Sequence, residues 1–78
     1  MGEIVTGKGE LSNSIRRSRK NRGMTQAQLA RALEVDRTYI CAIENGRRRP
    51  SLKILIGLSE VLEIDLMTLI FAGQSWKK

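Results

Sequence analysis

The segment MTQAQLARALEVDRTYICAIENG, residues 24–46, decides the fold of this chain. Near its start, Thr25 precedes Gln28 by three residues, the spacing at which two residues cap the first turn of a helix reciprocally. We therefore expect a helix over about 26–33. Residues 34–36 then interrupt the apolar pattern. Asp36, the last of them, is a good N-cap for a second helix, and Gly46 ends that helix. The segment predicts two short helices joined by a tight turn.

Apolar and capping residues on both sides of this segment predict three further helices. Leu11 and Ile15 are four residues apart and share one face of a basic helix over 11–22. Downstream, Ser51 caps a helix rich in leucine and isoleucine, and Asp65 caps a shorter apolar helix. We expect an all-α fold, a compact bundle of five short helices around the central pair.

The chain divides into one folded domain with a short extension at each end. Residues 1–10 hold three glycines and few apolar side chains, so we expect a flexible N-terminal arm there. Residues 11–72 carry the helical pattern, and residues 73–78 form a short C-terminal tail with an isolated tryptophan. A chain of 78 residues has room for one such domain, with a thin and mostly aliphatic core.

Basic residues are concentrated where the helical pattern is strongest. The chain has 14 lysines and arginines against 8 acidic residues, a net charge of +6. Eleven of the basic residues, but only three of the acidic ones, lie between Arg16 and Lys53. This asymmetry indicates an anionic partner.

The rarer residue types exclude several classes of function. One cysteine, Cys41, and no histidine leave no intramolecular disulfide, no structural zinc site and no histidine-based catalytic triad. No nucleophile–base pair, metal cluster or phosphate-binding loop is visible, so we expect neither an enzyme nor a bound cofactor, and no small-molecule ligand is evident. The N-terminus does not resemble a signal peptide and no apolar run is long enough for a membrane span, so we expect a cytoplasmic protein.

Four pieces of the sequence resemble the lambda-repressor-like helix-turn-helix family, also called the XRE or Cro/repressor type. They are IRxxRxxxGMTQxxLA from position 15, VDxxYIxxIExG from position 35, RPSL at 49–52 and LxIDxxxL at 62–69. Each piece is weak alone, but four in the right order without an insertion are specific. The string DRTYI at 36–40 also resembles the controller proteins of restriction-modification operons, and a small phage-type repressor fits the same pattern.

The chain departs from the family pattern at three positions. Ser18 stands where the family usually has an apolar residue, which thins the packing of the first helix. Glu34 and Glu63 replace the usual glycines of two similar turns, LEVD and LEID. A positive φ at either glutamate would cost about 1 kcal/mol relative to glycine. All three departures bear on stability and leave the implied DNA-binding face unchanged.

The resemblance implies that the helix after Asp36 lies in the DNA major groove while the helix before it crosses the backbone. The family's base-reading positions fall here on Arg37, Thr38 and Ala42. Arg37 can donate two hydrogen bonds to guanine O6 and N7, although a phosphate or solvent is its alternative partner. Thr38 can bind a base edge or contact a thymine methyl group, and Ala42 can make only an apolar contact.

The resemblance also implies contacts to backbone phosphates around the reading helix. Gln26 lies at the N-terminus of its helix, where its amide group can bind a phosphate. The hydroxyl group of Tyr39 can reach a second phosphate. The alternative for the tyrosine is partial burial against the preceding helix. The expected phosphate contacts are Gln26, Tyr39, Asn45, Arg47 and Arg48.

Two further sets of residues have implied structural roles. The family pattern pairs Glu44 with Arg19, which would tie the first helix to the reading helix. Ile70, Phe71 and Trp76 are candidates for a dimer interface, although they could instead close the monomer core. A small domain buries little surface on DNA, so we expect a homodimer.

The leading hypothesis is a sequence-specific transcriptional regulator, a repressor or controller encoded by a bacterium or phage. It would bind double-stranded DNA at a palindromic operator as a homodimer. One alternative is an antitoxin that represses its own operon and also binds a toxin as protein partner. Another is a protein-interaction module with the same fold, which would not need basic residues at Arg37 and in the loop 47–49.

Overall fold

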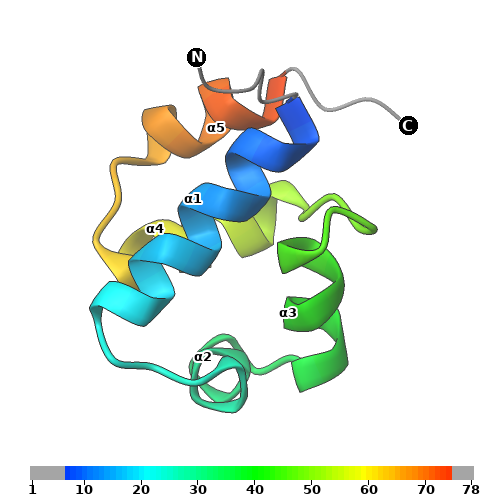
Figure 1. The fold of residues 1–78 in the computed structure, drawn as a ribbon. Coiled ribbons are helices and arrows are strands. Elements are labelled where there is room, and N and C mark those ends of the chain that lie inside the picture. The colour runs from blue at the N-terminus through cyan, green and yellow to red at the C-terminus, as the bar shows by residue number, and fades with distance from the viewer. Residues whose placement is uncertain (1–6, 75–78) are drawn as a thin grey trace.

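The structure, a computed structural model, describes residues 7–74, and these residues fold into five α-helices joined by short turns (Figure 1). The helices are α1 (Gly7–Asn21), α2 (Gln26–Leu33), α3 (Arg37–Glu44), α4 (Leu52–Leu62) and α5 (Leu66–Gln74). The predicted all-α bundle is confirmed. No helix in the described part of the chain is long and apolar enough to cross a membrane.

Capping side chains fix where the helices begin. The Thr25 Oγ1 atom accepts a hydrogen bond of 3.0 Å from the Gln28 backbone N–H, and the Gln28 Oε1 atom accepts one of 2.8 Å from the Thr25 N–H. This is the predicted capping box of α2. Ser51 caps α4 as predicted, since its Oγ atom accepts from the Ile54 N–H. Asp36 occupies the N-cap position of α3, but its side chain makes no capping hydrogen bond.

α1 begins at Gly7, four residues before the predicted start at Leu11. The additional turn contains Glu10, whose negative charge favours the N-terminal end of a helix, and it leads into the fully buried Leu11. The arm predicted for residues 1–10 therefore overlaps α1, and the rest of that arm lies outside the described residues.

α5 extends to Gln74, two residues past the predicted end of the helical pattern at residue 72. Gly73 is buried inside the helix, and a Cβ atom at this position would lie 3.3 Å from the Leu11 Cδ2 atom of α1. The glycine therefore permits the close approach of α1 and α5 and does not end the helix. The predicted tail beyond Gln74, with Trp76, lies outside the described residues.

The turns before α3 and α5 share the same backbone conformation, which sets the direction of the helix that follows. Glu34 has φ of 60° and Glu63 has φ of 56°, so both are in the left-handed conformation that favours glycine. In each turn the next residue, Val35 or Ile64, donates its N–H back to the preceding helix and packs half-buried against the core. The strain at the two glutamates, about 1 kcal/mol each, is the cost of directing α3 and α5.

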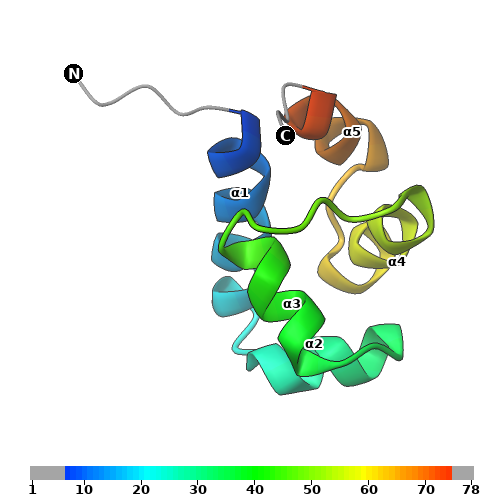
Figure 2. The ribbon, with the colours of Figure 1, turned by 90° about the vertical axis from the view of Figure 1, so that its right-hand side faces the viewer.

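The core lies between α1 and the other helices. α2 lies at one end of the bundle and α5 at the other, while α1 runs between them and contacts α3, α4 and α5 (Figures 1 and 2). The buried apolar residues are Leu11, Ile15, Leu29, Ala30, Ile40, Ile43, Leu55, Leu58, Leu62, Leu69 and Ala72. They come from all five helices, so α3 is fixed by packing that its own eight residues cannot supply.

Candidate nucleic-acid interface

The first turn of α3 presents polar side chains to solvent. Arg37 and Thr38 are exposed, and Ala42 follows one turn after Thr38, half-buried. On the opposite side of the same helix, Ile40 and Ile43 are buried in the core. The structure therefore brings the three predicted base-reading residues together on one outward side of α3.

The last residue of α3, Glu44, is only 2% exposed despite its charge. Its Oε2 atom lies 2.6 Å from Arg19 Nε, and its Oε1 atom accepts hydrogen bonds of 3.0 Å from Arg19 Nη2 and from Gln26 Nε2. Arg16 Nε lies 3.9 Å from Oε1. Arg19 and Glu44, the pair that the sequence resemblance implies, thus join α1 to α3 in a bidentate contact.

The environment of Glu44 keeps its carboxyl group ionised. Burial of the group acts to raise its pKa, and this is the largest single effect. Hydrogen bonds from Arg19 and Gln26, together with the positive charges of Arg19 and Arg16, outweigh burial, so the pKa of Glu44 lies below its ordinary value. The buried carboxylate is therefore a stable anchor for the cationic side chains around it.

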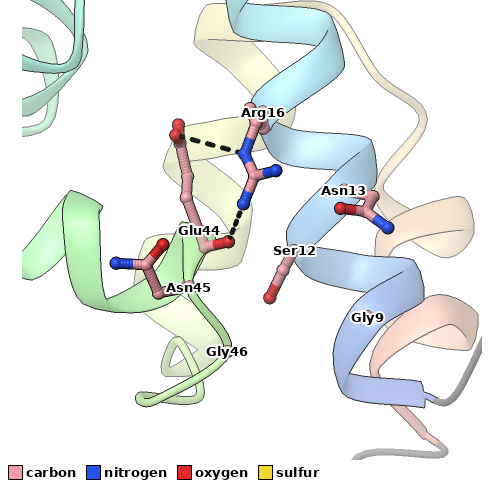
Figure 3. A pocket seen from close by; sticks show the side chains of 7 residues that line it. All are labelled: Gly9, Ser12, Asn13, Arg16, Glu44, Asn45 and Gly46. Atoms are coloured by element: carbon pink, nitrogen blue, oxygen red, sulfur yellow. Dashed lines mark hydrogen bonds and ion pairs between the residues drawn. The ribbon is translucent and has the colours of Figure 1, made fainter.

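α1 also binds the backbone at the C-terminal end of α3. The Ser12 hydroxyl donates a buried hydrogen bond of 2.7 Å to the Ile43 carbonyl, and Arg16 Nη2 donates one of 2.5 Å to the Glu44 carbonyl. Figure 3 shows Arg16 reaching from α1 to both the carbonyl and the carboxylate of Glu44, across a hollow that Asn13 and Asn45 also line. Carbonyls at the end of a helix have no partner within it, and here α1 supplies their donors.

A chain of polar contacts extends from this anchor to the exposed end of α3. Gln26 begins α2, and its Nε2 atom donates to Glu44 while its Oε1 atom accepts a hydrogen bond of 3.3 Å from Arg37 Nη1. The sequence predicts Gln26 as a phosphate contact, whereas the structure engages both polar atoms of its amide with α3. The backbone at the start of α2 remains the part of this residue suited to a phosphate.

The other predicted phosphate contacts lie at and beyond the end of α3. Asn45 and Arg47 are exposed, and Asn45 Nδ2 donates to Cys41 Sγ at 3.4 Å. Tyr39 is half-buried against the core cluster, which is the burial that the sequence leaves open as an alternative. The guanidinium carbon of Arg48 lies 5.1 Å from the centre of the Tyr39 ring.

Sequence reasoning missed the structural use of three side chains, two on α1 and one in the turn that follows it. Ser12 and Arg16 hold the end of α3, while Arg22 donates a hydrogen bond of 3.0 Å to the Leu62 carbonyl and pairs with Glu63 at 2.7 Å. These residues, with Arg19, lie at helical spacing on or beside the face that carries Ile15. That shared face is the signal by which they could have been separated from the solvated charges of α1.

Exposed apolar side chains gather on α4 and α5. We define the α4–α5 patch as Leu52, Ile56, Met67 and Phe71, which are 60%, 41%, 51% and 60% exposed. Leu52 and Ile56 belong to the apolar pattern of the helix that follows Ser51, yet both are exposed. Ile70 is half-buried and lines a hollow together with Leu52.

These features define a class of protein. Two short helices, α2 and α3, are joined by a tight turn, the second is anchored at its far end, and its first turn carries an exposed arginine and an exposed threonine. This arrangement is the helix-turn-helix unit of DNA-binding proteins. The family model described as helix-turn-helix matches residues 15–69, and the chain belongs to this family of transcriptional regulators. The family resemblance seen in the sequence is confirmed.

Known proteins resemble the chain over most of its length. The ImmF control region 10 kDa protein of Bacillus phage phi105 is 38% identical over 60 residues, which cover 77% of this chain and 67% of that protein. The restriction-modification controller protein C.AhdI from Aeromonas hydrophila has a TM-score of 0.74 at 29% identity, covering 80% of this chain and 94% of that one. SinR, a master regulator for biofilm formation solved in complex with DNA, has a TM-score of 0.71 at 30% identity, covering 77% of this chain and 97% of that one.

Proposed function

We propose that this protein is a repressor or controller of transcription that binds a palindromic operator as a homodimer in the bacterial cytoplasm. The observation that carries the proposal is the placement of Arg37 and Thr38, exposed on the first turn of an α3 helix whose other end is bound to α1 and α2. A helix held in this way can enter the major groove without being ordered first, so less of the binding free energy is lost.

The proposed readout assigns each residue a contact suited to its chemistry. Arg37 donates to guanine O6 and N7, Thr38 contacts a neighbouring base edge, and Ala42 contacts a thymine methyl group. Phosphates on either side would bind the start of α2 at Gln26 and the residues that follow α3 and face solvent. The residues that follow α3 are Asn45, Arg47 and Arg48, and Tyr39 of α3 lies beside Arg48.

A homodimer would supply the specificity that one copy lacks. A single module of this kind buries roughly 600–1,000 Å² on DNA, and two or three base contacts specify a short half-site. Two copies related by a two-fold axis would read half-sites about 34 Å apart. We assign the dimer contact to Ile70 and Phe71 on α5, with Trp76 from the tail, because Phe71 is an exposed large apolar residue within the α4–α5 patch.

Selection of bound sequences from a pool of random duplexes tests the proposal. The expected result is a palindromic consensus whose half-sites are one helical turn apart and each contain a guanine. A consensus without two-fold symmetry would exclude the symmetric homodimer, and recovery of no consensus would exclude sequence-specific regulation. Sedimentation of Phe71→Ala beside Glu60→Ala, an exposed change on α4, tests the interface: only the former should shift the protein towards monomer. Equal sedimentation of the two variants would remove Phe71 from the dimer contact.

A further inference from the structure

The loop after α3 folds back along the helix. Gly46 has φ of 76°, a left-handed conformation that lets the chain reverse direction. The backbone N–H groups of Arg47 and Arg48 then both donate to the Ala42 carbonyl, at 2.9 Å and 3.3 Å. This fold-back returns the Arg48 side chain to the Tyr39 ring, where the guanidinium carbon lies 5.1 Å from the ring centre.

Tyr39 is a fixed platform for that contact. Tyr39 is the third residue of α3 and follows the exposed Arg37 and Thr38. Its half-buried side chain packs against the core cluster. The chain has no other tyrosine, so its spectroscopic signals are unambiguous. The ring therefore has a position set by the core, whereas the Arg48 side chain has no hydrogen bond or ion pair within residues 7–74 to hold it.

Three consecutive arginines differ in this one respect. The side chains of Arg47, Arg48 and Arg49 are all exposed, and within residues 7–74 none of them makes a side-chain hydrogen bond or an ion pair. Arg48 alone among them lies over an aromatic ring. Because no Arg48 side-chain N–H has an acceptor within residues 7–74, these donors remain available to a phosphate while the guanidinium lies over the ring.

We propose that Tyr39 is a positioning residue that acts on DNA through Arg48. The ring holds the guanidinium beside the reading helix, with its edge directed to a backbone phosphate, so the loop contact is ordered before DNA binds. The Tyr39 hydroxyl does not itself carry the contact. This inference rests on the proposed function, because it assumes that α3 faces DNA.

A double-mutant cycle tests the coupling between the two side chains. The variants are Tyr39→Leu, Tyr39→Phe, Arg48→Ala and the Tyr39→Leu/Arg48→Ala double variant, with Arg49→Ala as the control for charge alone. The probe is a 30-base-pair duplex pool of random sequence, because phosphate contacts act on any duplex. Affinity is measured over a series of salt concentrations.

The expected pattern separates the ring from the hydroxyl. Arg48→Ala and Tyr39→Leu should each weaken binding about tenfold, and the double variant should be no weaker than Arg48→Ala. The slope of log affinity against log salt should fall by about 0.9 per protomer for Arg48→Ala. Tyr39→Phe should bind as the wild type does, and Arg49→Ala should lose less than Arg48→Ala.

Two results would overturn the proposal. If Tyr39→Phe is as weak as Tyr39→Leu, the hydroxyl binds DNA directly. If Tyr39→Leu weakens binding equally with and without Arg48, the ring does not act through this arginine. Failure of the wild-type protein to bind any duplex would instead contradict the proposed function itself, so the two failures are distinguishable.

Nuclear magnetic resonance of the wild-type protein provides a test that does not depend on a Tyr39 variant folding. Protons of the Arg48 side chain should be shifted upfield by the ring current of Tyr39, and those of Arg49 should not. The shift should persist in the DNA complex. If it disappears when DNA is added, the stacked arrangement belongs to the free protein alone and the proposal is wrong.

Discussion

The two ends of α3 differ in exposure and in the contacts that hold them. At the N-terminal end, Arg37 and Thr38 are exposed, and the Asp36 side chain at the cap position makes no capping hydrogen bond. At the C-terminal end, the buried Glu44 carboxylate receives four donated or ionic contacts, and the Ile43 carbonyl is bound by a serine of α1. In the proposed readout, the two polar base-reading residues and the buried anchor therefore lie at opposite ends of an eight-residue helix.

This separation teaches how so short a helix can serve as a rigid reading element. A helix of two turns is marginal by itself, so the geometry of α3 must come from its contacts with the rest of the protein. Because the buried contacts of α3 do not involve the exposed side chains of Arg37 and Thr38, changes at these two residues should alter binding while leaving stability nearly intact. Changes at the anchored end should do the reverse.

Loss of the Glu44 carboxylate should have the largest effect. Glu44→Ala leaves the buried Arg19 guanidinium without its partner, and breaking a buried pair in this way costs roughly 3–5 kcal/mol. The whole stability of a domain this small is roughly 3–5 kcal/mol, so the variant should be largely unfolded by circular dichroism at 25 °C. Glu60→Ala, an exposed change on α4, is the control and should unfold at the wild-type urea concentration. A folded Glu44→Ala protein would show that packing alone holds α3.

The same carboxylate should make stability depend on pH. The pKa of Glu44 is lower in the folded protein than its ordinary value of 4.5, so its contribution to stability is complete above about pH 4.5 and is lost as the pH falls through the folded-state pKa. Urea unfolding of the wild type between pH 7 and pH 3 should show this decline. Glu44→Gln should decline less steeply if it folds, since the amide does not titrate. Parallel declines in the two proteins would assign the pH dependence to other carboxylates.

At the free end, Arg37→Ala should separate binding from stability. Loss of a bidentate contact to guanine should cost roughly 1–3 kcal/mol of binding per half-site and relax the preference at that position. The free energy of unfolding should change by less than about 0.5 kcal/mol, because the side chain is exposed and its one hydrogen bond, to Gln26, is also exposed. Arg31→Ala removes an equal charge from the exposed surface of α2 and is the matched control. Equal losses of affinity in both variants would mean that Arg37 contributes only its charge to DNA binding and makes no base-specific contact.

The sequence predicts the free end of α3 better than the anchored end. Local signals are enough for the first: the Thr25 and Gln28 capping box starts α2, and the spacing of Ile40 and Ile43 shows which side of α3 faces inward. The anchored end depends on contacts between residues 25 to 31 positions apart, such as Ser12 with the Ile43 carbonyl. Every residue has a backbone carbonyl, so the sequence does not show which carbonyl a side-chain donor binds. That partner is identified only when the positions of the helices are known.

Helices with apolar residues on more than one face also limit what the sequence predicts. In α4, leucine and isoleucine occupy both the inner and the outer face, so periodicity does not separate the buried Leu55 and Leu58 from the exposed Leu52 and Ile56. Gly73 has the residue type of a helix end, yet it lies inside α5, where a Cβ atom would come within 3.3 Å of the Leu11 Cδ2 atom on the neighbouring α1. The deciding factor in both cases is the neighbouring helix, which acts only in the folded protein.

The smallest expected effect concerns the turn that leads into the free end. Glu34 and Glu63 have nearly the same left-handed backbone, but Glu63 pairs with Arg22 at 2.7 Å, whereas Glu34 has no ion pair within residues 7–74. Glu34→Gly should therefore stabilise the protein by about 0.5 kcal/mol, the relief of strain less the greater freedom of glycine in the unfolded chain. Glu63→Gly should gain less, because an exposed ion pair worth about 0.2–1 kcal/mol is lost with it.

Urea unfolding of the two variants side by side measures this difference, and operator binding of Glu34→Gly tests its consequence. Because the backbone at residue 34 is already in the conformation that glycine prefers, the direction of α3 should not change, and the affinity for DNA should equal that of the wild type. Equal stabilisation by both substitutions would mean that the Arg22 pair contributes nothing. A weaker affinity in Glu34→Gly would mean that this turn, and not the contacts of Glu44 alone, sets the orientation of the reading helix.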